Sequence, residues 1–109
     1  MMTKEFFPGI EKIRFEGKTS KNPMAFRYYD AEKIVYGKKM KEWFRFSMAW
    51  WHTLCAEGGD QFGGSTIHRE WNNITDPLEA AKAKMDAGFE FMQKLGIGFY
   101  CFHDTDLIA

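Results

Sequence analysis

The sequence predicts an α/β fold built around one strand–loop–helix–strand unit, and three observations lead to that expectation. Arg45–Leu54 is a nearly continuous apolar run, which suits a strand buried on both faces. Asp76–Gly96 has the periodicity and the end signals of a helix. Gly98–Phe102 is a second short apolar run, and we expect a buried strand there. A strand, a helix and a strand in this order imply parallel pairing and a right-handed crossover.

Residues 1–43 are expected to form an extended arm, and residues 44–109 the strand–helix–strand unit. The arm has little periodicity and carries turn signals such as Pro8-Gly9 and Asn22-Pro23. Its order should therefore come mainly from the packing of its aromatic rings. We expect a helical turn near Asp30–Val35 and a short helix over Met40–Phe44.

The helix over Asp76–Gly96 has signals at both ends. Asp76 and Glu79 are spaced as a capping box, Pro77 suits the first helical position, and Gly96 suits a left-handed stop. Charged residues are expected mostly on its exposed surface, namely Lys82, Lys84, Asp86, Glu90 and Lys94. The apolar residues that recur at helical spacing are expected to face the core, namely Leu78, Ala81, Met85, Phe89, Met92 and Leu95.

The long segment Cys55–Thr75 is expected to be a loop that joins the first strand to the helix. Loops of about 20 residues are usually functional or cover something. The loop is rich in glycine and holds one isolated large ring, Phe62. Phe62 could enter the pocket of a neighbouring molecule, or it could fold back onto its own domain. The glycines match neither common phosphate-binding pattern.

Composition narrows the classes of protein that the chain can represent. The 109 residues support one domain at most, and 15 basic residues balance 15 acidic ones. This balance does not favour a nucleic-acid partner. Cys55 and Cys101 fit no paired spacing, which favours a reduced, cytoplasmic protein. No apolar leader and no run of about 18–20 apolar residues is present, so no membrane association is expected.

The residues that carry chemistry follow the second strand directly. His103 leaves the strand end beside Asp104 and Asp106, and an oriented His103–Asp106 pair could act as a general acid/base. The alternative is a histidine that caps the strand end and acids that cap the next helix. At the end of the first strand, alternation would place Trp50 and Trp51 on opposite faces.

Trp50 is expected in the core, whereas Trp51 could either pack there or form an apolar wall for a sugar ring. A zinc site is not expected, because its candidate ligands have no supporting local spacing. Those candidates are Cys55, Cys101, His52, His68 and His103.

Several strings resemble the N-terminal quarter of xylose isomerase, and the long arm resembles the longer-chain class of that family. The match covers essentially the whole chain. Gly98 and Glu70 depart from the family pattern, because proline is usual at the first position and common at the second. The matching strings are Gly17…Ser20-Lys21-Asn22-Pro23…Ala25-Phe26…Tyr29, Phe46…Trp51-His52-Thr53, Asp60-x-Phe62-Gly63, Ala87-x-Phe89-Glu90 and Cys101-Phe102-His103-Asp104-x-Asp106.

The resemblance implies the N-terminal part of a (β/α)8 TIM barrel: extended arm, first strand, long loop, first helix and second strand. It implies a homotetrameric aldose–ketose isomerase that converts D-xylose to D-xylulose, with D-glucose to D-fructose as a side activity. His103 would assist ring opening and Asp106 would orient it. Trp51 would wall the sugar, and Phe62 would enter the neighbouring subunit's site.

The resemblance also implies two divalent cations, Mg²⁺ or else Mn²⁺ or Co²⁺, whose ligands lie on later strands. No metal ligand is therefore expected within these residues, and the chain is expected to be an N-terminal fragment that is inactive alone. Two other functions stay open. One is another metal-dependent barrel enzyme of the same superfamily, either a different sugar isomerase or an abasic-site endonuclease. The other is a small non-enzymatic αβ binding module.

Overall fold

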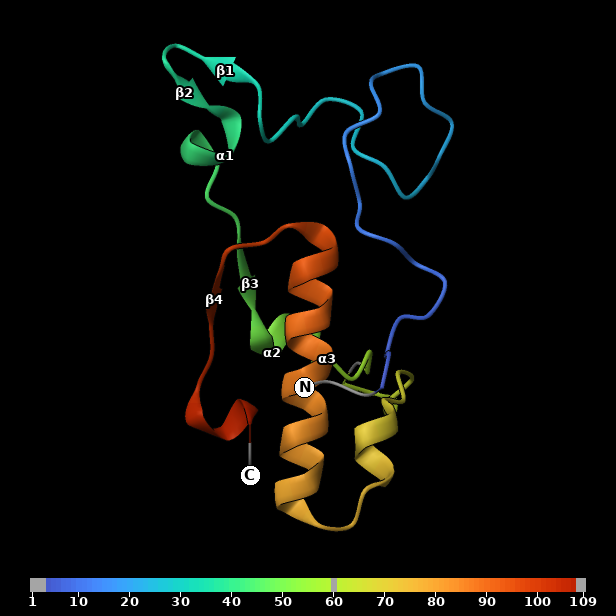
Figure 1. The fold of residues 1–109 in the computed structure, drawn as a ribbon. Coiled ribbons are helices and arrows are strands. Elements are labelled where there is room, and N and C mark those ends of the chain that lie inside the picture. Colours follow the sequence, from blue (N-terminus) through green and yellow to red (C-terminus); the bar gives the residue numbers. More distant parts are fainter. Residues whose placement is uncertain (1–3, 60, 108–109) are drawn as a thin grey trace.

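The computed structural model describes residues 4–59 and 61–107, so Asp60 of the family pattern lies outside the described residues. The radius of gyration is 16.5 Å, against about 13 Å for a compact domain of about 100 residues. Figure 1 shows why, because the arm and a small hairpin extend away from the helix and the strands beside it. The elements in chain order are β1 Ile34–Val35, β2 Lys38–Lys39, α1 Met40–Trp43, β3 Ser47–Ala49, α2 Trp50–Thr53, the 3₁₀ turn η1 Glu70–Asn73, α3 Pro77–Leu95, β4 Phe99–Cys101 and the 3₁₀ turn η2 Asp104–Asp106.

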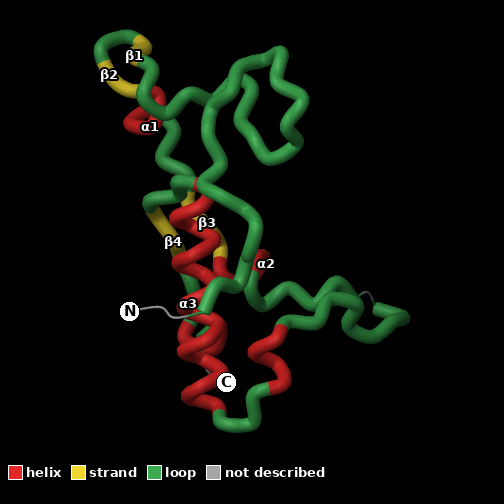
Figure 2. The backbone as a smooth tube through the Cα atoms, turned by 45° about the vertical axis from the view of Figure 1, so that its right-hand side comes forward, coloured by secondary structure: helices red, strands yellow, loops and turns green. Residues whose placement is uncertain are grey.

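The centre of the molecule is a parallel strand pair with the long helix α3 beside it (Figures 1 and 2). β3 pairs with β4 in parallel, with Ser47 opposite Phe99 and Ala49 opposite Cys101. The predicted strand–loop–helix–strand order and the parallel pairing are confirmed. The predicted burial of the second strand is wrong, because all three residues of β4 are exposed. A strand of a parallel sheet is buried only when both faces are covered.

The first strand is shorter than predicted. β3 ends at Ala49, and Trp50–Thr53 turn into the short helix α2, in which the Leu54 N–H donates to the Trp50 carbonyl at 2.9 Å. The predicted strand over Arg45–Leu54 is therefore wrong at residues 45–46 and beyond residue 49, and Ser47 is exposed instead of buried. An apolar run of this length does not distinguish a buried strand from a buried helical turn.

The ends of α3 lie where the sequence predicts, although the capping box does not form. Pro77 is the first helical residue and Gly96 ends the helix in a left-handed conformation with φ 72°. The Asp76 side chain makes no capping hydrogen bond. Glu79 instead pairs with Lys82 on the exposed surface, at 3.3 Å between Oε1 and Nζ.

The buried face of α3 is rotated from the predicted one. Met92 is buried as expected, whereas Leu78, Met85 and Phe89 are exposed. Ala87 and Gly88 form the face against which the core packs, because the absent side chain of Gly88 leaves room for the Trp50 ring. The buried core consists of Met48, Trp50, Leu54, Trp71, Ala87 and Met92.

The arm contains a hairpin where the sequence predicts a helical turn. β1 and β2 pair antiparallel, with Ile34 opposite Lys39 and Val35 opposite Lys38. The Lys33 N–H donates to the Asp30 carbonyl at 3.1 Å, so a turn is present at residues 30–33. The predicted helical turn near Asp30–Val35 is wrong at residues 34–35, because their pairing with β2 requires extended backbone. The short helix predicted over Met40–Phe44 is confirmed as α1.

Glu90 fastens the beginning of the arm to α3, although the sequence places it on the surface. Glu90 is 4% exposed. Its carboxylate accepts hydrogen bonds from the backbone N–H groups of Phe6 and Phe7 at 2.8 and 2.7 Å. Lys94, one turn later, donates to the Phe7 carbonyl at 2.6 Å and pairs with Glu5 at 2.7 Å.

The helices within the described residues include none long and apolar enough to cross a membrane.

Candidate functional site at the strand ends

The pairing register brings the two predicted site segments together. Ala49 and Cys101 are the last paired residues of β3 and β4, and Trp51 and His103 each lie two residues beyond them. Because the strands are parallel, their carboxyl ends meet at one edge of the sheet. The rings of Trp51 and His103 are in contact, with centroids 4.6 Å apart and planes inclined by 41°.

His103 and Asp106 form the predicted pair. Asp106 Oδ2 lies 3.2 Å from His103 Nδ1 and accepts the His103 backbone N–H at 2.7 Å. The Asp106 residue is 7% exposed, whereas the His103 side chain is open to solvent. A buried carboxylate thus holds an imidazole whose side chain is 66% exposed.

The alternative prediction, in which these residues cap a helix or strand end, is also met by this geometry. His103 is the residue that precedes η2, and the Asp106 carboxylate bonds to its backbone N–H. One carboxylate oxygen therefore both closes the turn and fixes the imidazole. The catalytic role of the pair stays a prediction.

The two tryptophans have different environments. Trp50 is 1% exposed in the core, as predicted, and Trp51 is only partly buried. The predicted placement of the two rings by strand alternation is wrong, because residues 50–53 are helical. The helical turn is what directs Trp51 toward His103.

Phe62 lies in the loop after α2 and is 90% exposed. Such exposure is compatible with a ring that reaches another molecule, and it does not decide against the alternative in which Phe62 folds back onto its own domain. Entry into a neighbouring subunit's site stays a prediction.

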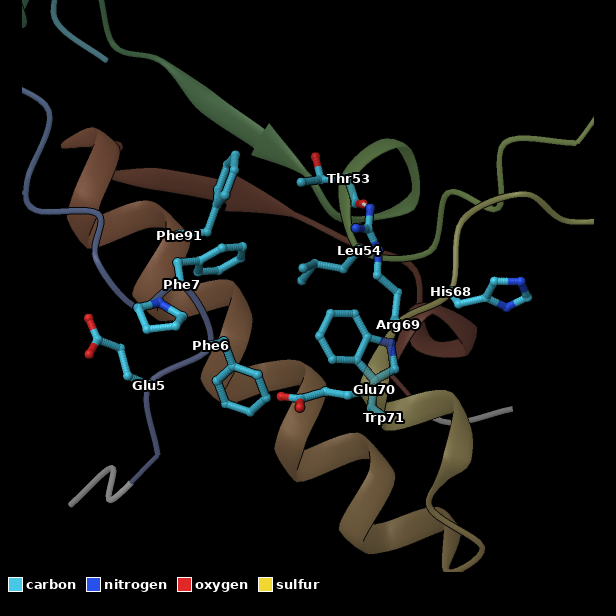
Figure 3. A pocket seen from close by; sticks show the side chains of 11 residues that line it. Glu5, Phe6, Phe7, Thr53, Leu54, His68, Arg69, Glu70, Trp71 and Phe91 are labelled. Carbon is cyan, nitrogen blue, oxygen red and sulfur yellow. Dashed lines mark hydrogen bonds between the residues drawn. The ribbon is translucent and has the colours of Figure 1, made fainter. Parts of the chain in front are cut away.

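A cavity of about 360 Å³ lies between the arm and the loop (Figure 3). Neither His103 nor Asp106 lines it. Arg69 on its wall donates from Nη2 to the Thr53 carbonyl at 3.0 Å. This bond ties the long loop to the end of α2, the helix that carries Trp51. The labelled side chains around the cavity are Glu5, Phe6, Phe7, Thr53, Leu54, His68, Arg69, Glu70, Trp71 and Phe91.

The sequence does not predict two residues that bind the backbone of Asp106. Lys84 of α3 and Cys55 after α2 both contact the Asp106 carbonyl. The sequence places Lys84 on the outer surface of the helix, and its contact joins residues 22 positions apart. No local pattern signals either contact.

The described parts of the chain, 4–59 and 61–107, contain no group of three His, Cys, Asp or Glu side chains arranged to hold a metal ion. The chemistry that the arrangement can supply is proton transfer at His103, oriented by Asp106, beside an apolar ring.

In α/β barrel enzymes the active-site residues lie at the carboxyl ends of the parallel strands, which is where this βαβ unit carries its His103–Asp106 pair and the Trp51 ring. The comparisons with known proteins are more specific. The chain is 75% identical over all 109 residues to xylose isomerase of Bacteroides thetaiotaomicron, of which it covers 25%. Identity to xylose isomerase of Bacteroides fragilis is 73% over the same residues, again 25% of that protein.

A plant protein shows the same resemblance, since xylose isomerase of Hordeum vulgare is 54% identical over 103 residues, 94% of this chain and 22% of that protein. No protein-family model matches the chain. The resemblance expected from the sequence is confirmed along the whole chain, which spans about a quarter of the length of the curated relatives that it matches.

Proposed function

We propose that this chain is the segment of a xylose isomerase that handles the ring-opening proton of the aldose. The contact set of His103, Asp106 and Trp51 is the observation that carries the proposal. The enzyme would convert D-xylose to D-xylulose, with D-glucose to D-fructose as a side activity. The high identity to xylose isomerases supports this substrate class.

His103 would move a proton between the anomeric hydroxyl and the ring oxygen of the sugar. Asp106 Oδ2 lies 3.2 Å from Nδ1 and would keep the proton of the neutral imidazole on that nitrogen. Nε2 then presents its lone pair to the substrate, accepts the anomeric proton and returns it to the ring oxygen. Transfer of this kind by a positioned side chain contributes about 10²–10⁴-fold to a rate.

Trp51 would form the apolar wall beside this imidazole. Its ring packs against His103 at 4.6 Å, so it limits the directions in which the imidazole can turn. The C–H groups of a sugar could pack on the part of the ring that stays exposed. Phe62 would fill a comparable role in the neighbouring subunit of a homotetramer.

The rest of the assembly is proposed from the family resemblance. Residues 1–43 would form the arm, and residues 44–109 the first βαβ unit of a (β/α)8 barrel. Two divalent cations, Mg²⁺ or else Mn²⁺ or Co²⁺, would be held by residues outside this segment. Such cations stabilise negative charge that develops on substrate oxygens. A cytoplasmic location is proposed on the same basis.

The proposal is tested in the full-length protein that contains this segment. His103→Gln removes the imidazole, and we expect kcat/KM for D-xylose to fall by about 10²–10⁴-fold. His68→Gln is the matched control, because His68 is an exposed histidine of the loop and should leave the rate unchanged. Trp51→Ala should raise KM, because the wall for the sugar is lost.

Two results would contradict the proposal. One is a wild-type full-length protein that does not isomerise D-xylose. The other is a His103→Gln variant that retains the wild-type kcat/KM while its fold, measured by circular dichroism, is unchanged.

A further inference from the structure

The backbone carbonyl of Asp106 is held by two side chains from other parts of the fold. Lys84 of α3 donates from Nζ at 2.8 Å, and Cys55 donates from Sγ at 3.3 Å. The two donors also contact each other, with Lys84 Nζ 3.8 Å from Cys55 Sγ. Through this carbonyl, α3 and the segment after α2 are both hydrogen-bonded to the η2 turn.

Asp106 connects these two hydrogen bonds to the imidazole of His103. Its carbonyl is fixed by Lys84 and Cys55, while its carboxylate holds the backbone N–H and Nδ1 of His103. A shift of the Asp106 backbone would consequently move the carboxylate that orients His103. The path from Lys84 to the imidazole passes through one residue.

The turn that carries Asp106 has little rigidity of its own. η2 contains three residues, and its own backbone bonds are Asp106 N–H to the His103 carbonyl at 3.0 Å and Leu107 N–H to the Asp104 carbonyl at 3.3 Å. Short 3₁₀ turns have poorer hydrogen-bond geometry than α-helices. External bonds are thus needed to keep the carboxylate in one place.

Lys84 and Cys55 suit this task chemically. A hydrogen bond from an ammonium group is charge-assisted, and such bonds are stronger than neutral ones. Burial is the main cause that raises the pKa of Cys55 above its ordinary value. The Cys55 sulfur therefore keeps its proton near neutral pH, and it can act as the second donor to the Asp106 carbonyl.

We propose that Lys84, assisted by Cys55, is a positioning residue that holds the Asp106 backbone and thereby fixes the orientation of the His103 imidazole. The proposal rests on the proposed function for its effect on rate. Its effect on the geometry of the pair does not depend on that function, because the contacts that carry it join residues of the chain itself.

The test uses three variants of the full-length protein that contains this segment. Lys84→Met removes the donor and keeps the length of the stem, and Lys84→Arg restores a charged donor. Lys82→Met is the matched control, since Lys82 lies on the same helix and pairs with the exposed Glu79. Crystal structures give the distance from His103 Nδ1 to Asp106 Oδ2, and steady-state kinetics with D-xylose give kcat and KM separately.

For Lys84→Met we expect the distance to lengthen beyond hydrogen-bond range, and kcat to fall by about 10- to 100-fold, the scale that a misplacement of about 1 Å can cause. KM should stay near the wild-type value, because the substrate contacts remain. Lys84→Arg should recover most of the loss, and Lys82→Met should match the wild type.

A purely structural role would lower the melting temperature of Lys84→Met without changing the distance or kcat, and that result overturns the proposal. If the distance lengthens in a protein without xylose isomerase activity, the positioning role stands and the proposed function fails. Should Lys84→Met not fold, Cys55→Ala and Cys55→Ser replace it. Loss of the pair in the alanine variant and its retention in the serine variant support the proposal, and equal behaviour of the two overturns it.

Discussion

Gly88 lies at the closest approach between α3 and the ring of Trp50. A Cβ atom at this position would lie 2.6 Å from Trp50 Cη2 and 2.8 Å from Leu54 Cδ1. Trp50 is 1% exposed, so its ring has no solvent-filled space into which it could move. The glycine is therefore required by packing, not by backbone conformation.

Gly88→Ala should destabilise the protein. Overpacking of a core costs about 1–3 kcal/mol, which exceeds the gain of about 1 kcal/mol that alanine brings to a helix interior. The melting temperature of the full-length protein, measured at one scan rate, should fall. Gly98→Ala is the control, because no atom lies within 4 Å of its added Cβ. An unchanged melting temperature for Gly88→Ala would contradict the packing argument.

Asp106 shows how much of the candidate site can be read from residues alone. The spacing of His103 and Asp106 predicts their pairing, because they are three positions apart and the turn between them is short. The contact of Trp51 with His103 depends on the strand register, and Lys84 and Cys55 depend on the packing of α3. Local patterns thus predict the pair itself and miss the residues that hold it.

At the scale of elements, the arm is fastened to α3 by a small polar network. Burial alone would raise the pKa of Glu90, but the hydrogen bonds from the Phe6 and Phe7 N–H groups and from Lys94 outweigh it and lower the pKa. Glu5 is the main cause that raises the pKa of Lys94. Both shifts favour the charged forms, so the network is strongest with both residues ionised.

Glu90→Gln should loosen the beginning of the arm. Each N–H of Phe6 and Phe7 donates to its own carboxylate oxygen. Glutamine replaces one of these oxygens by an NH₂ donor, so this arrangement is lost. Hydrogen exchange of the peptide around Phe6 and Phe7, measured in the full-length protein, should accelerate. Glu79→Gln is the control, because its exposed pair with Lys82 contributes little. Protection equal to the wild type in Glu90→Gln would show that the aromatic contacts alone hold the arm.

The same network predicts that the attachment of the arm to α3 depends on pH. The pKa of Glu90 is lowered in the folded protein, so its stabilisation is present above its unfolded pKa of about 4.5 and is lost as the pH falls through the lower folded value. The pKa of Lys94 is raised above 10.5, so its contribution is present below that value and is lost at higher pH. Exchange at Phe6 and Phe7, corrected for the intrinsic rate, should be slowest between these limits. Protection that does not change below pH 4 would contradict the role of Glu90.

At the scale of the whole molecule, the sequence predicts the elements whose signals are local. Pro77 and Gly96 mark the ends of α3, and the order of the elements predicts parallel pairing. The helical turn at Trp50 was missed because the apolar run before it has no period that separates strand from helix. The buried Glu90 was missed because its backbone partners lie more than 80 positions away.

The described residues leave much apolar surface uncovered. Strand β4 is exposed along its length, although parallel sheets are normally covered on both faces. Phe44 and Phe46 stack beside the sheet with ring centroids 6.2 Å apart, and both remain exposed. Patches of this kind mark a surface on which further structure packs. In a (β/α)8 barrel, that structure would be the following strands and helices.

We therefore expect the 109-residue chain, produced alone, to associate or to fold poorly and to be inactive. Two pairs of short strands and one long helix bury too little apolar area to offset the loss of chain entropy. Light scattering after size exclusion should show species larger than the 12.8 kDa monomer, and thermal melting should lack a cooperative transition. The full-length protein, measured beside it, should melt cooperatively. A monomeric 109-residue chain with a cooperative melt and measurable aldose isomerisation would instead mean that the strand-end site is complete without the remaining barrel.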